Sequence, residues 1–287
     1  MGGQRKTPRI PSPAYLSVFQ MRAPELLASE PCSPPALRDA WAGAWSNANY
    51  EHSPLNQKSL QAIPQEDVEE FKSYISTIPW DFGSFEPSID GRLISSEADV
   101  RQFVDSAIIL PAWPVILAMV PLPAHGDSKR GYDLVLKNEQ SLDGSSRPDE
   151  AIARASVDSG RSWFRPIVLI ELKGPGVLSS LESMGGGNMP ESDDLMSVTR
   201  QLRKYSVEGR TPTLFVMDNT HALYLRFSDA TDENDSVEFA VASSGADKDR
   251  FPTFTIRELF VFSAWRSFSD LNIVPRFALS IDFHSTR

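Results

Sequence analysis

The sequence predicts an α/β fold in which a mixed β-sheet is flanked by helices. Apolar residues change from helical spacing to alternation near residue 131 and return to helical spacing near residue 195. Three short strand-like segments follow one another, which favours an antiparallel meander. A helical segment then separates the third strand from the fourth, and a connection of that length lets these two strands run parallel.

The chain divides into two predicted regions. Residues 1–55 are rich in proline and lack periodicity, so we expect a largely irregular N-terminal arm there. Residues 56–287 are expected to form a single domain, with its core at about 95–227. A chain of 287 residues, 41% of them hydrophobic, is long enough to bury a sizeable core.

Two helices are predicted ahead of the sheet. Apolar side chains share one stripe of residues 66–77, which indicates a helix. Ser96 and Asp99 resemble a capping box in which aspartate replaces glutamate. The apolar residues that follow repeat with helical spacing, so a second helix is predicted from about 96 to 109.

The predicted meander consists of residues 131–137, 147–155 and 166–172. The first segment alternates clearly between polar and apolar residues, and the second alternates weakly. The third is an unbroken apolar run before Glu171, which predicts a strand buried on both faces.

The second half of the core is predicted to contain a helix, three strands and a closing helix. Leu195, Val198 and Leu202 share one side of the first helix. The expected elements are a helix at 195–207, strands at 213–217, 221–227 and 236–242, the last at the edge of the sheet, and an aromatic helix at 255–268.

Charge and cysteine content exclude several classes of protein. A net charge of −10 counts against a sequence-independent nucleic-acid coat protein, which is usually basic. Cys32 is the single cysteine, so no intramolecular disulfide or cysteine zinc site can form, and we expect an intracellular protein, cytoplasmic or nuclear. The four histidines lack metal-ligand spacing, and prolines interrupt the apolar run 108–123, so we expect neither a zinc hydrolase nor a membrane span.

Three residues carry the predicted chemistry. Glu171 and Lys173 lie two apart on a strand, which puts both on the same face of the sheet. We expect a hairpin to bring Asp149, on the preceding strand, beside Glu171, against the alternative that Asp149 only caps a turn after Pro148. Two nearby carboxylates repel each other and need a cation, and hard oxygen ligands favour Mg²⁺ or Mn²⁺. Lys173 could orient or activate a water molecule there, or stabilise phosphate charge.

These residues support a family resemblance. Arg147-Pro148-Asp149 followed by Ile170-Glu171-Leu172-Lys173 resembles the PD-(D/E)XK nuclease superfamily, in the manner of its divergent fungal members. The resemblance covers about residues 95–227. It implies a restriction-endonuclease-like sheet and metal-dependent hydrolysis of nucleic acid, with DNA as the expected substrate and Mg²⁺ (or Mn²⁺) as the cofactor. It also implies that Asp149 and Glu171 bind the metal and that Lys173 is the catalytic lysine.

Further residues enter through the same resemblance. Gln201 and Tyr205 are similar to a Gln-xxx-Tyr element of some family branches and are expected to bind substrate. Arg203 and Lys204, on the same helix, are expected to contact phosphates, although a solvated helix face is an equal alternative. Glu97 is the candidate for a third metal ligand, against the alternative that it only complements the helix dipole.

A second function stays open. The same fold could serve as a catalytically inactive binding or interaction module, or as an effector, since fold does not determine function. The acidic net charge and the proline-rich arm favour this alternative. The oligomeric state does not follow from the sequence.

Overall fold

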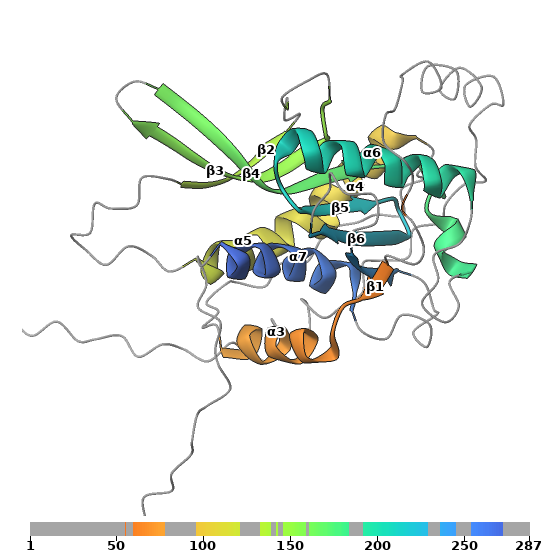
Figure 1. The fold of residues 1–287 in the computed structure, drawn as a ribbon, viewed down its shortest axis with the longest axis horizontal. Coiled ribbons are helices and arrows are strands. Elements are labelled where there is room, and N and C mark those ends of the chain that lie inside the picture. The colour runs from red at the N-terminus through yellow and green to blue at the C-terminus, as the bar shows by residue number, and fades with distance from the viewer. Residues whose placement is uncertain are drawn as a thin grey trace, which may run out of the picture.

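A mixed sheet of seven strands forms the centre of the protein (Figure 1). The computed structural model describes residues 55, 60–77, 96–120, 133–138, 142, 146–158, 161–183, 192–228, 236–244 and 254–271. The strands are β1 (Leu60–Ala62), β2 (Asp133–Asn138), β3 (Glu150–Asp158), β4 (Arg161–Leu172), β5 (Thr213–Met217), β6 (His221–Phe227) and β7 (Val237–Ser243). The helices are α3 (Gln65–Thr77), α4 (Glu97–Val104), η2 (Asp105–Ile109), α5 (Leu110–Met119), η3 (Ser179–Ser183), α6 (Asp193–Gly209) and α7 (Ile256–Asp270). The predicted α/β class is therefore confirmed.

The strand order is β1-β7-β6-β5-β4-β3-β2. Strands β2, β3 and β4 form the predicted antiparallel meander, and β4 runs parallel to β5 because α6 connects them. Strands β5, β6 and β7 continue in antiparallel pairs. The prediction that 236–242 lies at the edge is wrong, because β1 pairs in parallel with the outer side of β7.

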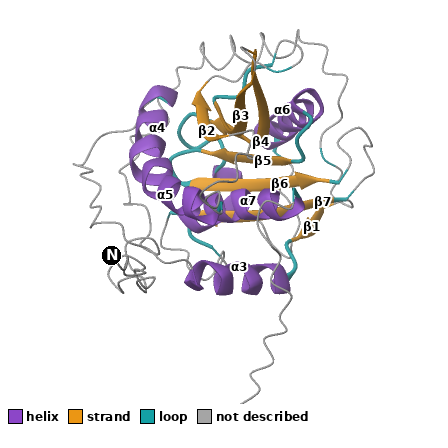
Figure 2. Ribbon diagram, turned by 90° about the vertical axis from the view of Figure 1, so that its left-hand side faces the viewer, coloured by secondary structure: helices purple, strands orange, loops and turns teal. Residues whose placement is uncertain are grey.

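Helices cover both faces of the sheet (Figure 2). Helix α6 packs on one face, and α7 packs on the other with α5 beside it. Helix α3 lies outside α7, where Phe71 meets Phe262 with ring centroids 5.3 Å apart. Side chains alternate between the two cores along each central strand, and this period of two fixes which residues can meet α6.

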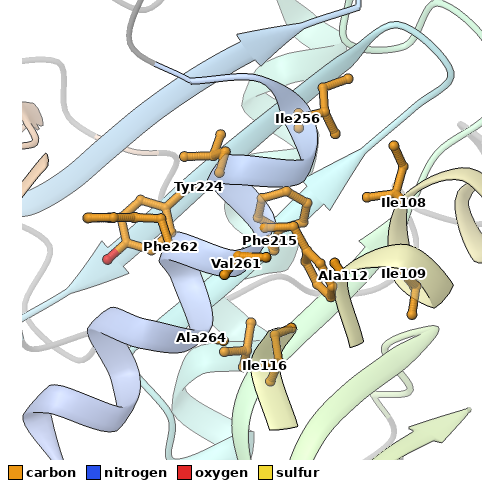
Figure 3. Close-up of a cluster of buried hydrophobic side chains, with 14 of the residues drawn as sticks. Ile108, Ile109, Ala112, Ile116, Phe215, Tyr224, Ile256, Val261, Phe262 and Ala264 are labelled. Atoms are coloured by element: carbon orange, nitrogen blue, oxygen red, sulfur yellow. The ribbon is translucent and has the colours of Figure 1, made fainter. Parts of the chain in front are cut away.

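The larger core lies between α5, α7 and the middle of the sheet (Figure 3). Phe215 of β5 packs against Phe260 with ring centroids 5.3 Å apart, and Tyr224 of β6 packs against Phe262 at 5.6 Å. Ile116 of α5 reaches the same cluster. Residues 167–172 of β4 and the whole of β5 are buried on both faces.

The second predicted helix is much longer than expected. It starts at the predicted capping box, where Ser96 and Asp99 bond each other's backbone N–H groups. It then passes through the π-helical turn η2 and continues as α5 to Met119, so the predicted end at 109 is wrong. Pro111 has no N–H to offer the carbonyl of Ala107, and the buried Arg257 donates to that carbonyl instead, at 2.6 Å.

This continuous helix, Glu97–Met119, is long and apolar enough to cross a membrane by length and composition alone. More than half of its most apolar window, 56%, is buried inside the molecule, where it contacts α7. That burial is typical of a core helix. Leu110 and Leu117 are the exposed exceptions among its large apolar side chains.

Strand β4 starts five residues before the predicted position of 166. Its first half pairs with β3 up to the pair formed by Asp158 and Arg161. The register shifts between Ile152 and Ala153, where Ala153 faces Pro166. Proline cannot donate a backbone hydrogen bond, so a bulge beside it is the expected way to keep it inside a paired strand.

Candidate active site at the ends of strands β3 and β4

The ends of β3 and β4 bring Asp149 and Glu171 together. Glu150 faces Ile170 in the antiparallel register, so Asp149, one residue earlier, falls opposite Glu171. The backbone N–H of Leu172 donates to Oδ2 of Asp149 at 2.8 Å, which fixes the side chain toward β4. The predicted hairpin geometry therefore accounts for the placement of both carboxylates.

Lys173 and Gln201 hold the carboxylate of Glu171. Nζ of Lys173 donates to Oε1 of Glu171 at 2.6 Å, as expected for residues on the same face of β4. Helix α6 contributes Gln201, whose Nε2 donates to the same Oε1 at 2.8 Å and whose Oε1 accepts from Lys173 at 2.8 Å. Tyr205 lies one helical turn further on and hydrogen-bonds the amide of Gln201. All four side chains are buried.

Asp218 supports the segment that follows Lys173. The backbone N–H of Lys173 continues the ladder by donating to the carbonyl of Met217 at 2.9 Å. Oδ2 of the buried Asp218 accepts from the N–H of Leu178 at 2.9 Å, and its Oδ1 accepts from the N–H groups of Thr220 and His221. The loop after Lys173 is thus tied to the turn between β5 and β6.

Three carboxyl groups, those of Asp149, Glu171 and Glu97, lie near two cations, Lys173 and Arg101. Burial raises the pKa of Glu171 to about 7; the charge of Lys173 opposes this shift and that of Asp149 adds to it. Glu97 lies at the start of α4. Although its side chain is exposed overall, partial desolvation, together with the charge of Asp149, raises the pKa of its carboxyl group. A divalent cation would relieve this repulsion.

Arg101 pairs with Asp149. Its Nη2 hydrogen-bonds Oδ1 of Asp149 from α4, one helical turn after Glu97. The side chain of Arg101 is 33% exposed, whereas that of Asp149 is 15% exposed. The two oxygens of Asp149 are therefore committed, one to the backbone of β4 and one to Arg101.

A second pair of carboxyl groups lies beside the site. Glu150 is buried and points to the opposite face from Glu171, where it meets Asp105 of the π-helical turn. Burial and then the hydrogen bond with Asp105 raise the pKa of Glu150 to about 8. At neutral pH Glu150 is therefore mainly protonated and can donate its proton to the carboxylate of Asp105.

The donor set suits a magnesium-like ion. Oε2 of Glu171 is buried and has no hydrogen-bond partner, which is the costly state for a carboxylate oxygen unless a cation or water approaches it. Within the described residues, no group of three or more His, Cys, Asp or Glu side chains is arranged to hold a metal ion. Mg²⁺ does not need such a cage, because one or two carboxylates with water and phosphate oxygens complete its shell. Asp149 and Glu171 therefore fit this ion.

Arg203 and Lys204, the two predicted phosphate contacts, have other partners in the structure. Arg203 is only 1% exposed and lies over the ring of Phe227, 5.8 Å from its centroid, on the sheet side of α6. The guanidinium group of Arg203 therefore has almost no exposed surface, which does not favour the predicted phosphate contact. Lys204 is half-buried and pairs with Glu208 at 3.6 Å on the same helix. Gln201 and Tyr205, in contrast, lie beside Glu171 and Lys173.

Two participants, Arg101 and Asp218, have no clear signal in the sequence. Arg101 reaches Asp149 across 48 residues, and the helical spacing of Glu97, Arg101 and Asp105 would have suggested a shared face but no partner. Asp218 belongs to an Asp-Asn-Thr turn, which predicts local hydrogen bonds but not the one to Leu178.

No protein-family model, curated protein or solved structure matches this chain.

Proposed function

We propose that the protein is a metal-dependent nuclease of the PD-(D/E)XK type that hydrolyses phosphodiester bonds in nucleic acid, with DNA as the expected substrate. The observation that carries this proposal is the set of contacts around Glu171. Its carboxylate shares a sheet end with Asp149, takes Lys173 and Gln201 on one oxygen, and leaves the other oxygen buried without a partner.

Asp149 and Glu171 would hold Mg²⁺ (or Mn²⁺), with Glu97 as a further acidic group within electrostatic range. When bound, such an ion supplies an activated water and stabilises the charge that develops on the phosphate. Burial, and to a smaller extent the charge of Asp149, raises the pKa of Glu171, and the dipositive charge of the ion would oppose both effects.

The protein's own residues contribute orientation and charge. Gln201 keeps Oε1 of Glu171 turned toward α6, so Oε2 is the oxygen left for a ligand. Lys173 bonds both Glu171 and Gln201, which fixes its ammonium group beside the carboxylate. An ammonium group held there can stabilise a negatively charged phosphate oxygen without reorganising.

Cleavage of labelled single- and double-stranded DNA and RNA tests this proposal. The full chain is incubated with Mg²⁺, with Mn²⁺ and with a chelator. We expect divalent-dependent cleavage that falls at least about 100-fold in Asp149→Asn, Glu171→Gln and Lys173→Met. Glu66→Gln and Lys72→Met, exposed on α3, are the matched controls and should cleave like the wild type. Equal cleavage in all six proteins would reject the proposal.

A second candidate function rests on the contacts that already neutralise the site. Arg101 pairs with Asp149, and Lys173 pairs with Glu171, so both carboxylates have a protein cation. A nuclease fold kept as a binding or interaction module would need no metal beyond these contacts. This candidate predicts that the chain binds no Mn²⁺ and cleaves no nucleic acid, while remaining fully folded.

A further inference from the structure

Each oxygen of the Asp149 carboxylate has a partner, and Arg101 holds one of the two. Oδ2 accepts the N–H of Leu172 at 2.8 Å, a bond that belongs to the end of β4. Oδ1 accepts Nη2 of Arg101. A cation that approaches Oδ1 of Asp149 therefore meets the guanidinium group.

We infer that Arg101 is an exchangeable cation, which holds Asp149 while the site is free of metal and leaves it when a divalent cation binds to Asp149 and Glu171. The chain would thus carry a built-in block on its own metal site. This inference rests on the proposed function, since it requires that Asp149 and Glu171 bind the metal.

The two cations of the site differ in their freedom to move. The side chain of Lys173 is 9% exposed and bonds two buried partners, Glu171 and Gln201. The side chain of Arg101 is 33% exposed, and it reaches Asp149 from a helix rather than from the strands of the site. Arg101 can therefore swing toward solvent without disturbing the sheet, whereas Lys173 cannot.

Released guanidinium has other acceptors nearby. Glu97 lies one turn before Arg101 and Asp105 one turn after it, and both spacings bring side chains together on a helix. Electrostatic contacts already link Arg101 to Glu97 and to Glu150, the partner of Asp105. The exchange therefore moves the guanidinium group of Arg101 a short way, from the carboxylate of Asp149 to that of Glu97 or Asp105.

Exchange is favoured over sharing of the oxygen. A dication and a guanidinium group on one half-buried carboxylate oxygen would repel each other strongly, because little water screens them. Carboxylate oxygens are preferred ligands of Mg²⁺ and Mn²⁺. The metal should therefore displace Arg101 and not join it.

Calorimetric titration with MnCl₂ tests the inference. The full-length wild type is compared with Arg101→Gln, and Arg165→Gln, an exposed arginine on β4, is the matched control. We expect Arg101→Gln to bind Mn²⁺ at least about fivefold more tightly, because no internal cation has to leave. Arg165→Gln should bind like the wild type. Asp149→Asn should abolish binding in both backgrounds.

A second readout needs no variant. Phenylglyoxal labels accessible arginines, and peptide mass spectrometry reports each position. Added Mn²⁺ should raise the labelling of Arg101 and leave that of Arg165 unchanged. Unchanged or reduced labelling of Arg101 at saturating Mn²⁺ would overturn the exchange, even if Arg101→Gln did not fold.

The outcomes separate this inference from the proposed function. Wild-type binding that depends on Asp149 and Glu171, with equal or weaker binding in Arg101→Gln, overturns the exchange and leaves the proposed function intact. If Arg101→Gln binds Mn²⁺ and the wild type does not, the result supports the exchange and shows that Arg101 blocks the site completely. Absence of Mn²⁺ binding in both proteins rejects the metal site, and the exchange with it.

Discussion

Gln201 donates its side-chain amide to Oε1 of Glu171 over 2.8 Å and so ties helix α6 to the strand that carries the acidic residue. The carbonyl oxygen of the same side chain accepts Nζ of Lys173, also at 2.8 Å. One buried amide thus holds two residues of the proposed site in place. Its removal should lower the free energy of unfolding and weaken metal binding.

Replacing Gln201 with leucine should destabilise the fold by about 2 kcal/mol, because Glu171 and Lys173 remain buried while each loses a hydrogen-bond partner. Urea denaturation measures the change. Tyr205→Phe is the matched control: it removes the hydroxyl group next to Gln201 and leaves the contacts to Glu171 and Lys173. We expect it to cost under about 1 kcal/mol. An equal loss in the two variants would contradict this role of Gln201.

Metal binding should depend on pH through Glu171. Burial raises the pKa of this carboxyl group to about 7, and a protonated carboxyl group is a poor ligand. Below that pH one proton must leave for each metal bound, so Mn²⁺ affinity should fall about tenfold per pH unit. It should level off above about pH 8. Titrations followed by electron paramagnetic resonance, from about pH 5.5 to about pH 8.5, test this; a constant affinity would contradict it.

Glu150→Gln should make the protein more stable at high pH. Burial and the hydrogen bond with Asp105 raise the pKa of Glu150 from 4.5 to about 8, so between these values the folded state keeps a proton that the unfolded state has lost. The free energy of unfolding of the wild type therefore falls as pH rises through this window. Glutamine keeps a donor for Asp105 and does not titrate.

The expected gain of Glu150→Gln over the wild type is roughly 2 kcal/mol larger at about pH 9 than at about pH 5. Glu171 titrates in both proteins, so its contribution largely cancels in this difference. Urea denaturation at the two pH values provides the measurement, with the exposed Glu66→Gln as control. A difference that does not change with pH would show that Glu150 titrates normally.

Arg257 and Pro111 should be coupled. Arg257 donates to the carbonyl of Ala107 at 2.6 Å because Pro111 lacks the N–H that would bond it in a regular helix. We expect Arg257→Met to cost about 2–3 kcal/mol, since a hydrogen bond from a charged donor is lost and the carbonyl stays buried. In the Pro111→Ala background, where the helix can supply an N–H, the cost should be at least about 1 kcal/mol smaller. Strict additivity in a double-mutant cycle would refute the coupling.

Several elements follow directly from the sequence. The strands at 213–217 and 221–227 have the predicted bounds, because a turn of Asp-Asn-Thr separates two apolar segments that pair locally. The capping box of Ser96 and Asp99 is also confirmed. Glu171 and Lys173 share a face because strand geometry alone requires it. In each case the interaction that decides the structure is short in range.

Other features depend on contacts that no local pattern encodes. Strand β1 has three residues, too few for a periodic signal, and exists because it pairs with β7 far along the chain. Helix α5 contains Pro111, and Arg257, about 150 residues away, bonds the Ala107 carbonyl that this proline leaves open. Arg203 is buried because α6 turns that side of the helix to the sheet, where Phe227 faces the guanidinium group.

Mn²⁺ binding to Glu171→Gln tests the proposed site most directly. The substitution keeps the size of the side chain and removes the charge whose Oε2 lies buried without a partner. At about pH 8 we expect the wild type to bind one Mn²⁺ and the variant to lose at least about 100-fold in affinity, because a ligand has been removed. Glu66→Gln should bind like the wild type. Equal affinity in wild type and Glu171→Gln, or no binding in either, would contradict a metal site at the ends of β3 and β4.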